Sequence, residues 1–93
     1  MKIFKLDPKN LNSHHWDAST YQGVVIARAE NEKNALRKAT LVFCIAVEIK
    51  SKGQSTAINP WILGDHVDCK EDNNSKYSID GDEEILYPNI NDF

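Results

Sequence analysis

The sequence of 93 residues has no hydrophobic run long enough to cross a membrane. Its longest apolar stretch, residues 41–47, is far shorter than the roughly 20 residues that a membrane-spanning helix needs. Residues 1–5 carry lysines but lack the apolar core and the cleavage site of a secretory signal peptide. We therefore expect a soluble, cytoplasmic protein that has no membrane partner.

Cysteine and glycine are scarce as well. The two cysteines, Cys44 and Cys69, are too few for a disulfide scaffold, and we expect both to be reduced thiols. The four glycines lie singly, so the sequence has no glycine-rich phosphate-binding loop. No internal repeat or low-complexity segment is present. This length predicts one small domain, residues 1–93.

The net charge of −3 is unevenly distributed along the chain. Residues 1–63 contain nine Lys/Arg and five Asp/Glu, a net charge of +4, whereas residues 64–93 contain two Lys and nine Asp/Glu, a net charge of −7. We expect the acidic third to fold back over the basic part and neutralise it. The alternative is an exposed acidic face that recruits a basic partner.

Two segments near the N-terminus have the composition of strands. Residues 2–6 are rich in strand formers and should end before Pro8, which lacks a hydrogen-bond donor. Residues 23–29 are apolar on both faces up to Arg28, which predicts a strand inside the sheet. In the polar loop between these strands, Trp16 should pack against the core and anchor the loop.

A helix should follow the second strand. Asn31 is a typical N-cap, and Glu32 lies in the first turn, where the helix dipole favours an acidic side chain. The pattern predicts a helix from Glu32 to about Ile45. Its buried stripe should consist of Ala35, Ala39, Val42 and Ala46, with Leu36 and Phe43 beside it.

The second half of the chain has weaker patterns. Residues 47–50 alternate between apolar and charged side chains, which favours an extended segment, and residues 51–59 are predicted to be a loop anchored by Trp61. Two further strands are expected at residues 66–70 and 84–87.

This order of elements predicts an α+β fold: a small, mainly antiparallel sheet of three to four strands, with one main helix packed on one face. The order along the chain is strand, strand, helix, strand and a possible fourth strand. Val67 and Cys69 should face the core. The deepest core should contain Val24, Ile26, Leu36, Ala39, Phe43 and Val67.

Five short segments resemble a group of small, uncharacterised bacterial proteins. They are Lys2-Ile3-Phe4-Lys5-Leu6, Trp16-Asp17-Ala18-Ser19-Thr20, Arg28-Ala29-Glu30-Asn31-Glu32, Pro60-Trp61 and Leu86-Tyr87-Pro88. The resemblance implies a bacterial protein, but it implies no activity, ligand or catalytic residue.

The histidines and one cysteine are of the types that bind zinc. The candidates are His14, His15, Asp17, His66 and Cys69. A zinc site needs four converging ligands, whereas residues three apart in a strand, such as His66 and Cys69, point to opposite faces. We therefore expect solvent-exposed histidines, a core cysteine and no metal site.

The remaining reactive groups also favour structural roles. Cys44 lies late in an apolar run, where burial should raise the thiol pKa and make it inert. The acidic cluster around Gly81 lacks the spacing of a calcium loop, and we expect a solvated loop. Its members are Asp80, Asp82, Glu83 and Glu84.

A basic stripe is the remaining charge pattern. It could be formed by Lys2, Lys5, Lys9, Lys33, Arg37 and Lys38. Nucleic-acid binding usually needs a basic domain, whereas the isoelectric point here is about 5.5, so we disfavour nucleic acid as a partner.

The sequence therefore leads to three hypotheses about function. The first is a non-enzymatic protein-interaction module, with a protein partner or a second copy of the chain, because an open sheet has edges that can accept another strand. The second is an accessory enzyme or metal-dependent domain, and the third is an acidic mimic of nucleic acid that inhibits a DNA-binding partner. We predict no catalytic, cofactor-binding or metal-ligating residue and no cofactor. Convergence of His14, His15, His66 and Cys69 would favour the second hypothesis, and an exposed row of the late acids would favour the third.

Overall fold

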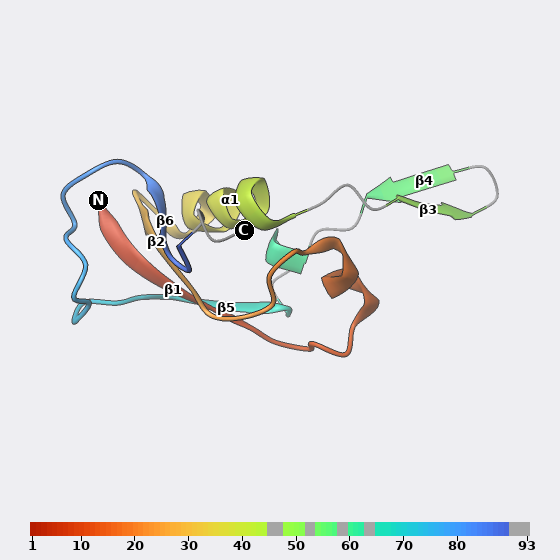
Figure 1. Cartoon of the computed structure of the whole chain (residues 1–93), viewed down its shortest axis with the longest axis horizontal. Helices are drawn as coiled ribbons and strands as arrows, with labels where there is room; N and C mark the ends of the chain where they lie inside the picture. Colours follow the sequence, from red (N-terminus) through yellow and green to blue (C-terminus); the bar gives the residue numbers. More distant parts are fainter. Residues whose placement is uncertain (45–47, 52–53, 58–59, 63–64, 90–93) are drawn as a thin grey trace.

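The computed structural model (Figure 1) describes residues 1–44, 48–51, 54–57, 60–62 and 65–89. Four strands form an antiparallel sheet in the order β5-β1-β2-β6, and helix α1 covers one face of it, so the predicted α+β fold is confirmed. The elements in chain order are β1 (Lys2–Pro8), η1 (His14–Ala18), β2 (Val25–Ala29), α1 (Glu32–Phe43), β3 (Glu48–Ser51), β4 (Gln54–Ala57), η2 (Pro60–Ile62), β5 (Val67–Glu71) and β6 (Glu84–Tyr87).

Strand β1 lies in the centre of the sheet, between β2 and β5. The predicted end of this strand before Pro8 is wrong, because β1 runs through Pro8, which pairs with Val67. A proline lacks one donor of the ladder, but here it is the last residue of the strand. Hydrogen bonding resumes directly after it, since Lys9 N donates to His66 O at 2.7 Å.

Strand β2 lies inside the sheet, as predicted, but the predicted core face of this strand is wrong by one residue. The core side chains are Val25, Ala27 and Ala29, which are fully buried under α1. Val24 and Ile26 are only half-buried, because alternate side chains of a strand point to opposite faces. A segment that is apolar on both faces does not itself determine which face meets the helix.

Helix α1 begins as predicted, with the Asn31 side chain accepting a hydrogen bond from Asn34 N at 2.9 Å. It ends at Phe43, two residues before the predicted end. Ala35 and Ala39 are fully buried, so these small side chains allow the helix to lie close to the sheet. Of the remaining predicted core residues, Phe43 and Val67 are buried, whereas Leu36 packs against the core half-buried.

Both tryptophans anchor loops, as predicted. Trp16 is 1% exposed and its Nε1 donates to Lys9 O at 2.8 Å. Trp61 is fully buried and its Nε1 donates to Ser19 Oγ at 2.9 Å. The two rings meet edge to face, with centroids 5.2 Å apart, a favourable geometry for aromatic pairs.

Strands β3 and β4 form a separate two-stranded sheet, which extends away from the main sheet in Figure 1. The predicted loop over residues 51–59 is therefore wrong for Ser51 and for Gln54–Ala57, and its residues 52–53 and 58–59 lie outside the described residues. These four residues lack the apolar alternation that identifies a strand, and pairing with β3 is what makes them extended. The predicted extended segment is confirmed for residues 48–50, whereas residue 47 lies outside the described residues.

Strands β5 and β6 form the two edges of the main sheet, so the segment that joins them must cross it. We call this segment, residues 72–83, the strap. It crosses the face turned away from α1, where Asp72 N donates to Ile3 O at 2.7 Å and Arg28 Nε donates to Ser78 O at 2.9 Å. The strand predicted at residues 84–87 is confirmed, and β5 begins one residue after its predicted start.

The acidic third folds back on the basic part of the chain, as predicted, but the described ion pairs neutralise only part of its charge. Three ion pairs join the two parts: Lys2 to Glu71 at 3.6 Å, Lys9 to Asp68 at 3.0 Å and Arg28 to Glu84 at 3.2 Å.

Candidate functional site

The sheet face turned away from α1 carries the candidate site. Cross-strand pairing places one residue from each strand in a row: Tyr87, Ile26, Lys5 and Lys70. Residues directly opposite one another on antiparallel strands share a face, and Ile26 faces away from α1. The row therefore changes from apolar at β6 to basic at β5.

A β-bulge turns Tyr87 to this face. Ile85 pairs with Ala27 and is buried in the core, whereas Tyr87, two residues later, pairs with Ile26. In a regular strand residues 85 and 87 would share a face, but the shift of register between the two pairs reverses the second side chain. Tyr87 remains 49% exposed on the edge strand.

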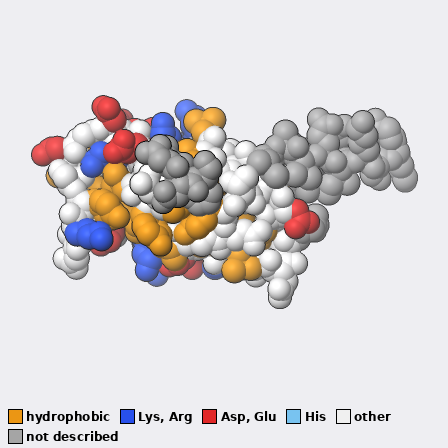
Figure 2. All heavy atoms as spheres, viewed as in Figure 1, with side chains coloured by type: hydrophobic (Ala, Val, Ile, Leu, Met, Phe, Trp, Pro, Cys, Tyr) orange, Lys and Arg blue, Asp and Glu red, His pale blue; other side chains and the backbone are white. Residues whose placement is uncertain are grey.

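An open hollow of about 490 Å³ lies between β2, β6 and the strap. Its apolar wall is formed by Val24, Ile26, Tyr77 and Tyr87, and its polar wall includes Asn74, Ser75 and Lys76. Lys76 Nζ lies 5.5 Å from the centroid of the Tyr77 ring, within the range of a cation–π interaction. Figure 2 shows hydrophobic side chains gathered over the sheet, with charged side chains at the border of this area.

Tyr21 connects the hollow to the core. Its hydroxyl donates to Val24 O at 2.9 Å, and its ring lies 5.2 Å from the ring of Phe43 in the core. Burial raises the pKa of Tyr21, and the neighbouring Tyr87 raises it further. The phenol therefore keeps its proton, and remains a hydrogen-bond donor, to a higher pH than an ordinary tyrosine.

Arg28 fastens the strap to the sheet. Its side chain is 10% exposed, and its Nη1 donates to Asp82 O and to Glu84 Oε1, both at 3.2 Å. Glu83 Oε2 accepts hydrogen bonds from Glu30 N and Asn34 Nδ2. The predicted solvated loop is thus wrong for Glu83, which is half-buried, and for Glu84, which lies in β6, although Glu84 remains exposed like Asp80 and Asp82.

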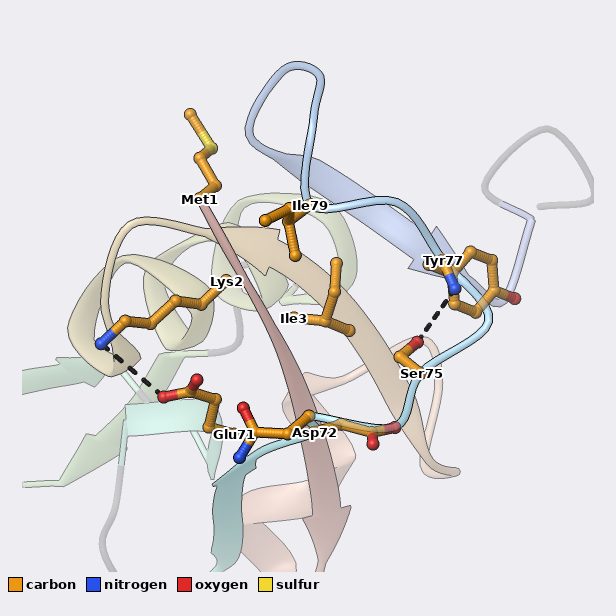
Figure 3. A pocket seen from close by; sticks show the side chains of 9 residues that line it. Met1, Lys2, Ile3, Glu71, Asp72, Ser75, Tyr77 and Ile79 are labelled. Carbon is orange, nitrogen blue, oxygen red and sulfur yellow. Dashed lines mark hydrogen bonds and ion pairs between the residues drawn. The ribbon is translucent and has the colours of Figure 1, made fainter.

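A second hollow of about 340 Å³ lies where the strap meets the start of β1 (Figure 3). Figure 3 shows Ile3 and Ile79 pointing toward one another and α1 behind the sheet. The rim carries the Lys2–Glu71 ion pair. Tyr77 lines both hollows, so the strap separates them.

The structure brings together two of the residues of metal-ligating type. His66 is buried, its ring lies 5.2 Å from that of His15, and its Nδ1 lies 2.7 Å from Asp65 Oδ1. The expectation of a solvent-exposed histidine is therefore wrong for His66. Its Nε2 is buried without a hydrogen-bond partner among the described residues. Cys69 packs against the core, as predicted.

These contacts do not complete a metal site within the described part of the chain. There, no three His, Cys, Asp or Glu side chains lie close enough together to hold an ion. The His14 side chain lies outside the described residues, and Asp17 is exposed. No pattern in the sequence predicts the contact between His15 and His66, which arises because Trp16 anchors the first loop beside the start of β5.

Cys44 and Cys69 are half-buried thiols. Burial raises the pKa of both, and that of Cys69 reaches about 12, with a smaller contribution from Glu32. The predicted direction of the Cys44 pKa is confirmed. Because a reactive thiol needs a lowered pKa, neither cysteine has the environment of a nucleophile.

Comparisons of the chain with known protein families, curated proteins and solved structures find no match. Among the residues that the structure describes, no helix is both long and apolar enough to span a membrane.

Proposed function

We propose that the protein is a small, non-enzymatic interaction module that binds a segment of another protein on the sheet face away from α1. The observation that carries this proposal is the open hollow lined by Val24, Ile26 and Tyr87. Concave apolar surface with a few polar groups at its border is typical of a binding site. On the opposite face of β2, the side chains that meet α1 are completely buried. The partial exposure of Val24 and Ile26 is therefore specific to the face away from α1.

The reactive groups support a binding role over catalysis. The pKa of both thiols is raised, which opposes nucleophilic attack. Cysteines in the thiol form also suit a reducing compartment, so the cytoplasm remains the proposed location.

A metal-dependent function is the second candidate. It is favoured by the buried Nε2 of His66, which lies next to His15 and has no hydrogen-bond partner among the residues that the structure describes. It is less well supported than binding on the sheet, because a structural zinc ion takes four ligands. The acidic-mimic hypothesis has less support still, since Glu83 is half-buried and Glu84 pairs with Arg28, which interrupts an exposed row of the late acids.

The proposal can be tested by selecting short random peptides for binding to the purified protein. We expect peptides to be enriched, and we expect their binding to be lost in Ile26→Thr and in Tyr87→Ser. Leu41→Thr is the matched control, because Leu41 is 72% exposed on α1, on the other side of the sheet. Circular dichroism would establish that each variant is folded. Failure to enrich any peptide, or enriched peptides that still bind both hollow variants, would contradict the proposal.

A further inference from the structure

We infer that the segment bound on this face is an extended acidic peptide that inserts one large apolar side chain into the hollow. This inference rests on the proposed function and specifies the chemistry of its partner. It follows from the basic groups that border the hollow and from the spacing of the cross-strand row.

Three lysines lie near the apolar wall of the hollow. Lys5 is the cross-strand neighbour of Ile26, Lys70 is the neighbour of Lys5, and Lys76 lies on the strap at the border of the hollow. Lys70 and Lys76 are exposed, and neither forms an ion pair with a residue in the described part of the chain.

Lys5 is also available to a partner. Its ion pair with Asp7 is long, at 3.8 Å, and both side chains are about half exposed. Exposed pairs of this kind contribute little free energy, typically below about 1 kcal/mol. A carboxylate of the partner can therefore compete for Lys5 without disrupting a buried interaction.

The spacing of the row predicts the pattern of the partner. Neighbouring strands lie about 4.8 Å apart, so Lys5 and Lys70 are about 5 and 10 Å from Ile26 across the sheet. In an extended peptide, residues i and i+2 face the same side and lie about 6.6 Å apart. Residues i+2 and i+4 therefore lie about 6.6 and 13 Å from residue i, and the long lysine side chains can span the difference of about 2–3 Å. A peptide that crosses the strands thus presents an apolar residue to the hollow and acidic residues at i+2 and i+4 to the two lysines.

A peptide fits this face better than a nucleic acid. Asp7 and Asp68 are paired across β1 and β5 beside the row, and Asp72 lies on the strap at the hollow. Each of these carboxylates would repel a chain that carries a phosphate at every nucleotide. A peptide can confine its negative charges to the positions opposite the lysines.

Fluorescence anisotropy with labelled synthetic peptides tests the inference. The probes are an extended peptide with one Trp followed by Glu at i+2 and i+4, the same peptide with Lys in place of both Glu, and the Glu peptide with Ser in place of Trp. We expect only the Trp–Glu peptide to bind well. Lys5→Gln and Lys70→Gln should each weaken this binding about 2- to 5-fold, the range for an exposed ion pair. Lys33→Gln is the control, because Lys33 is an exposed residue of α1.

The outcomes separate the inference from the proposed function. Equal binding of the Glu and Lys peptides, both lost in Ile26→Thr, would overturn the acidic preference and leave the interaction site in place. Failure of all three peptides, or binding that Ile26→Thr and Tyr87→Ser do not change, would count against both. Binding of a labelled single-stranded oligonucleotide that is lost in Lys5→Gln would identify a nucleic acid as the partner instead. If sedimentation shows a dimer for the native protein and a monomer for Ile26→Thr, the partner on this face is a second copy of the chain.

Discussion

The guanidinium of Arg28 packs directly against the backbone of Gly81. A Cβ atom at Gly81 would lie 2.5 Å from Arg28 Nη1, closer than such atoms approach in proteins. Gly81 also has a φ of 132°, a conformation that side chains other than glycine rarely adopt. Because Arg28 lies on β2 and Gly81 lies in the strap, this contact holds the strap against the sheet. The strap also borders the hollow next to β2 and β6.

Gly81→Ala should therefore destabilise the protein. The strained backbone costs about 1–3 kcal/mol, and the added methyl group must also displace Arg28. Urea unfolding should show a lower midpoint, whereas Asp80→Ala, at the exposed neighbouring residue, should change the free energy of unfolding by no more than about 0.5 kcal/mol. Equal midpoints for the two variants would mean that the strap does not depend on this contact.

The core under α1 gives a second prediction. Phe43 is 1% exposed and contacts the ring of Trp61, with centroids 5.8 Å apart. Phe43→Ala should cost about 3–5 kcal/mol, because it removes a large buried ring and leaves a cavity. Leu41→Ala, two residues away but 72% exposed, should have little effect on the urea midpoint. An unchanged midpoint for Phe43→Ala would disprove the packing of the last helical turn.

The sequence predicted the elements of the fold better than the pairing between them. The glycine-opened β-branched run and the Asn31 cap are local signals, and both led to correct elements. Residues 24 and 26 were assigned to the wrong face because β2 is apolar on both sides, so only tertiary contact determines its orientation.

The candidate site was missed for a related reason. Its row joins Lys5, Ile26, Lys70 and Tyr87, which become neighbours only through the strand register. The bulge that turns Tyr87 outward has no signature in this sequence, since Ile85 and Tyr87 read as one apolar face. The alternation at residues 66–70 did place Cys69 inward, and it could have shown that Lys70 faces away from the core.

Cys69 should make stability depend on pH in the alkaline range. Burial raises its pKa from 9.0 to about 12, so between these values the folded thiol keeps a proton that the unfolded thiol has lost. The stabilising contribution is complete below pH 9.0 and declines as the pH rises toward about 12. From about pH 8 to about pH 10, urea unfolding of the native protein should lose more free energy than that of Cys69→Ala. Parallel losses in the two proteins would show that the thiol does not titrate in this way.

Zinc content distinguishes the two candidate functions. We expect the purified protein to hold no stoichiometric zinc, because in the described part of the chain no three His, Cys, Asp or Glu side chains lie close enough to hold an ion, and a structural zinc ion takes four ligands. Elemental analysis should find far less than one zinc per chain, and a chelator should leave the melting temperature unchanged. One zinc per chain that is lost in His66→Asn would instead favour a metal-dependent function.

Salt should modestly lower the melting temperature, because the acidic third is already paired with the basic part. The pairs Lys2–Glu71, Lys9–Asp68 and Arg28–Glu84 all connect residues from opposite sides of position 63. Each exposed pair contributes less than about 1 kcal/mol, and added salt screens it, so the loss is small and cumulative.

Neutralising Asp82, Glu83 and Glu84 should fail to stabilise the fold, since Glu84 would lose Arg28 and Glu83 would lose its contact with Asn34. If the acids instead repelled one another across an exposed face, both salt and neutralisation would stabilise the protein. A melting temperature that rises between low and physiological sodium chloride would therefore favour an acidic partner-binding surface over the internal pairing described above.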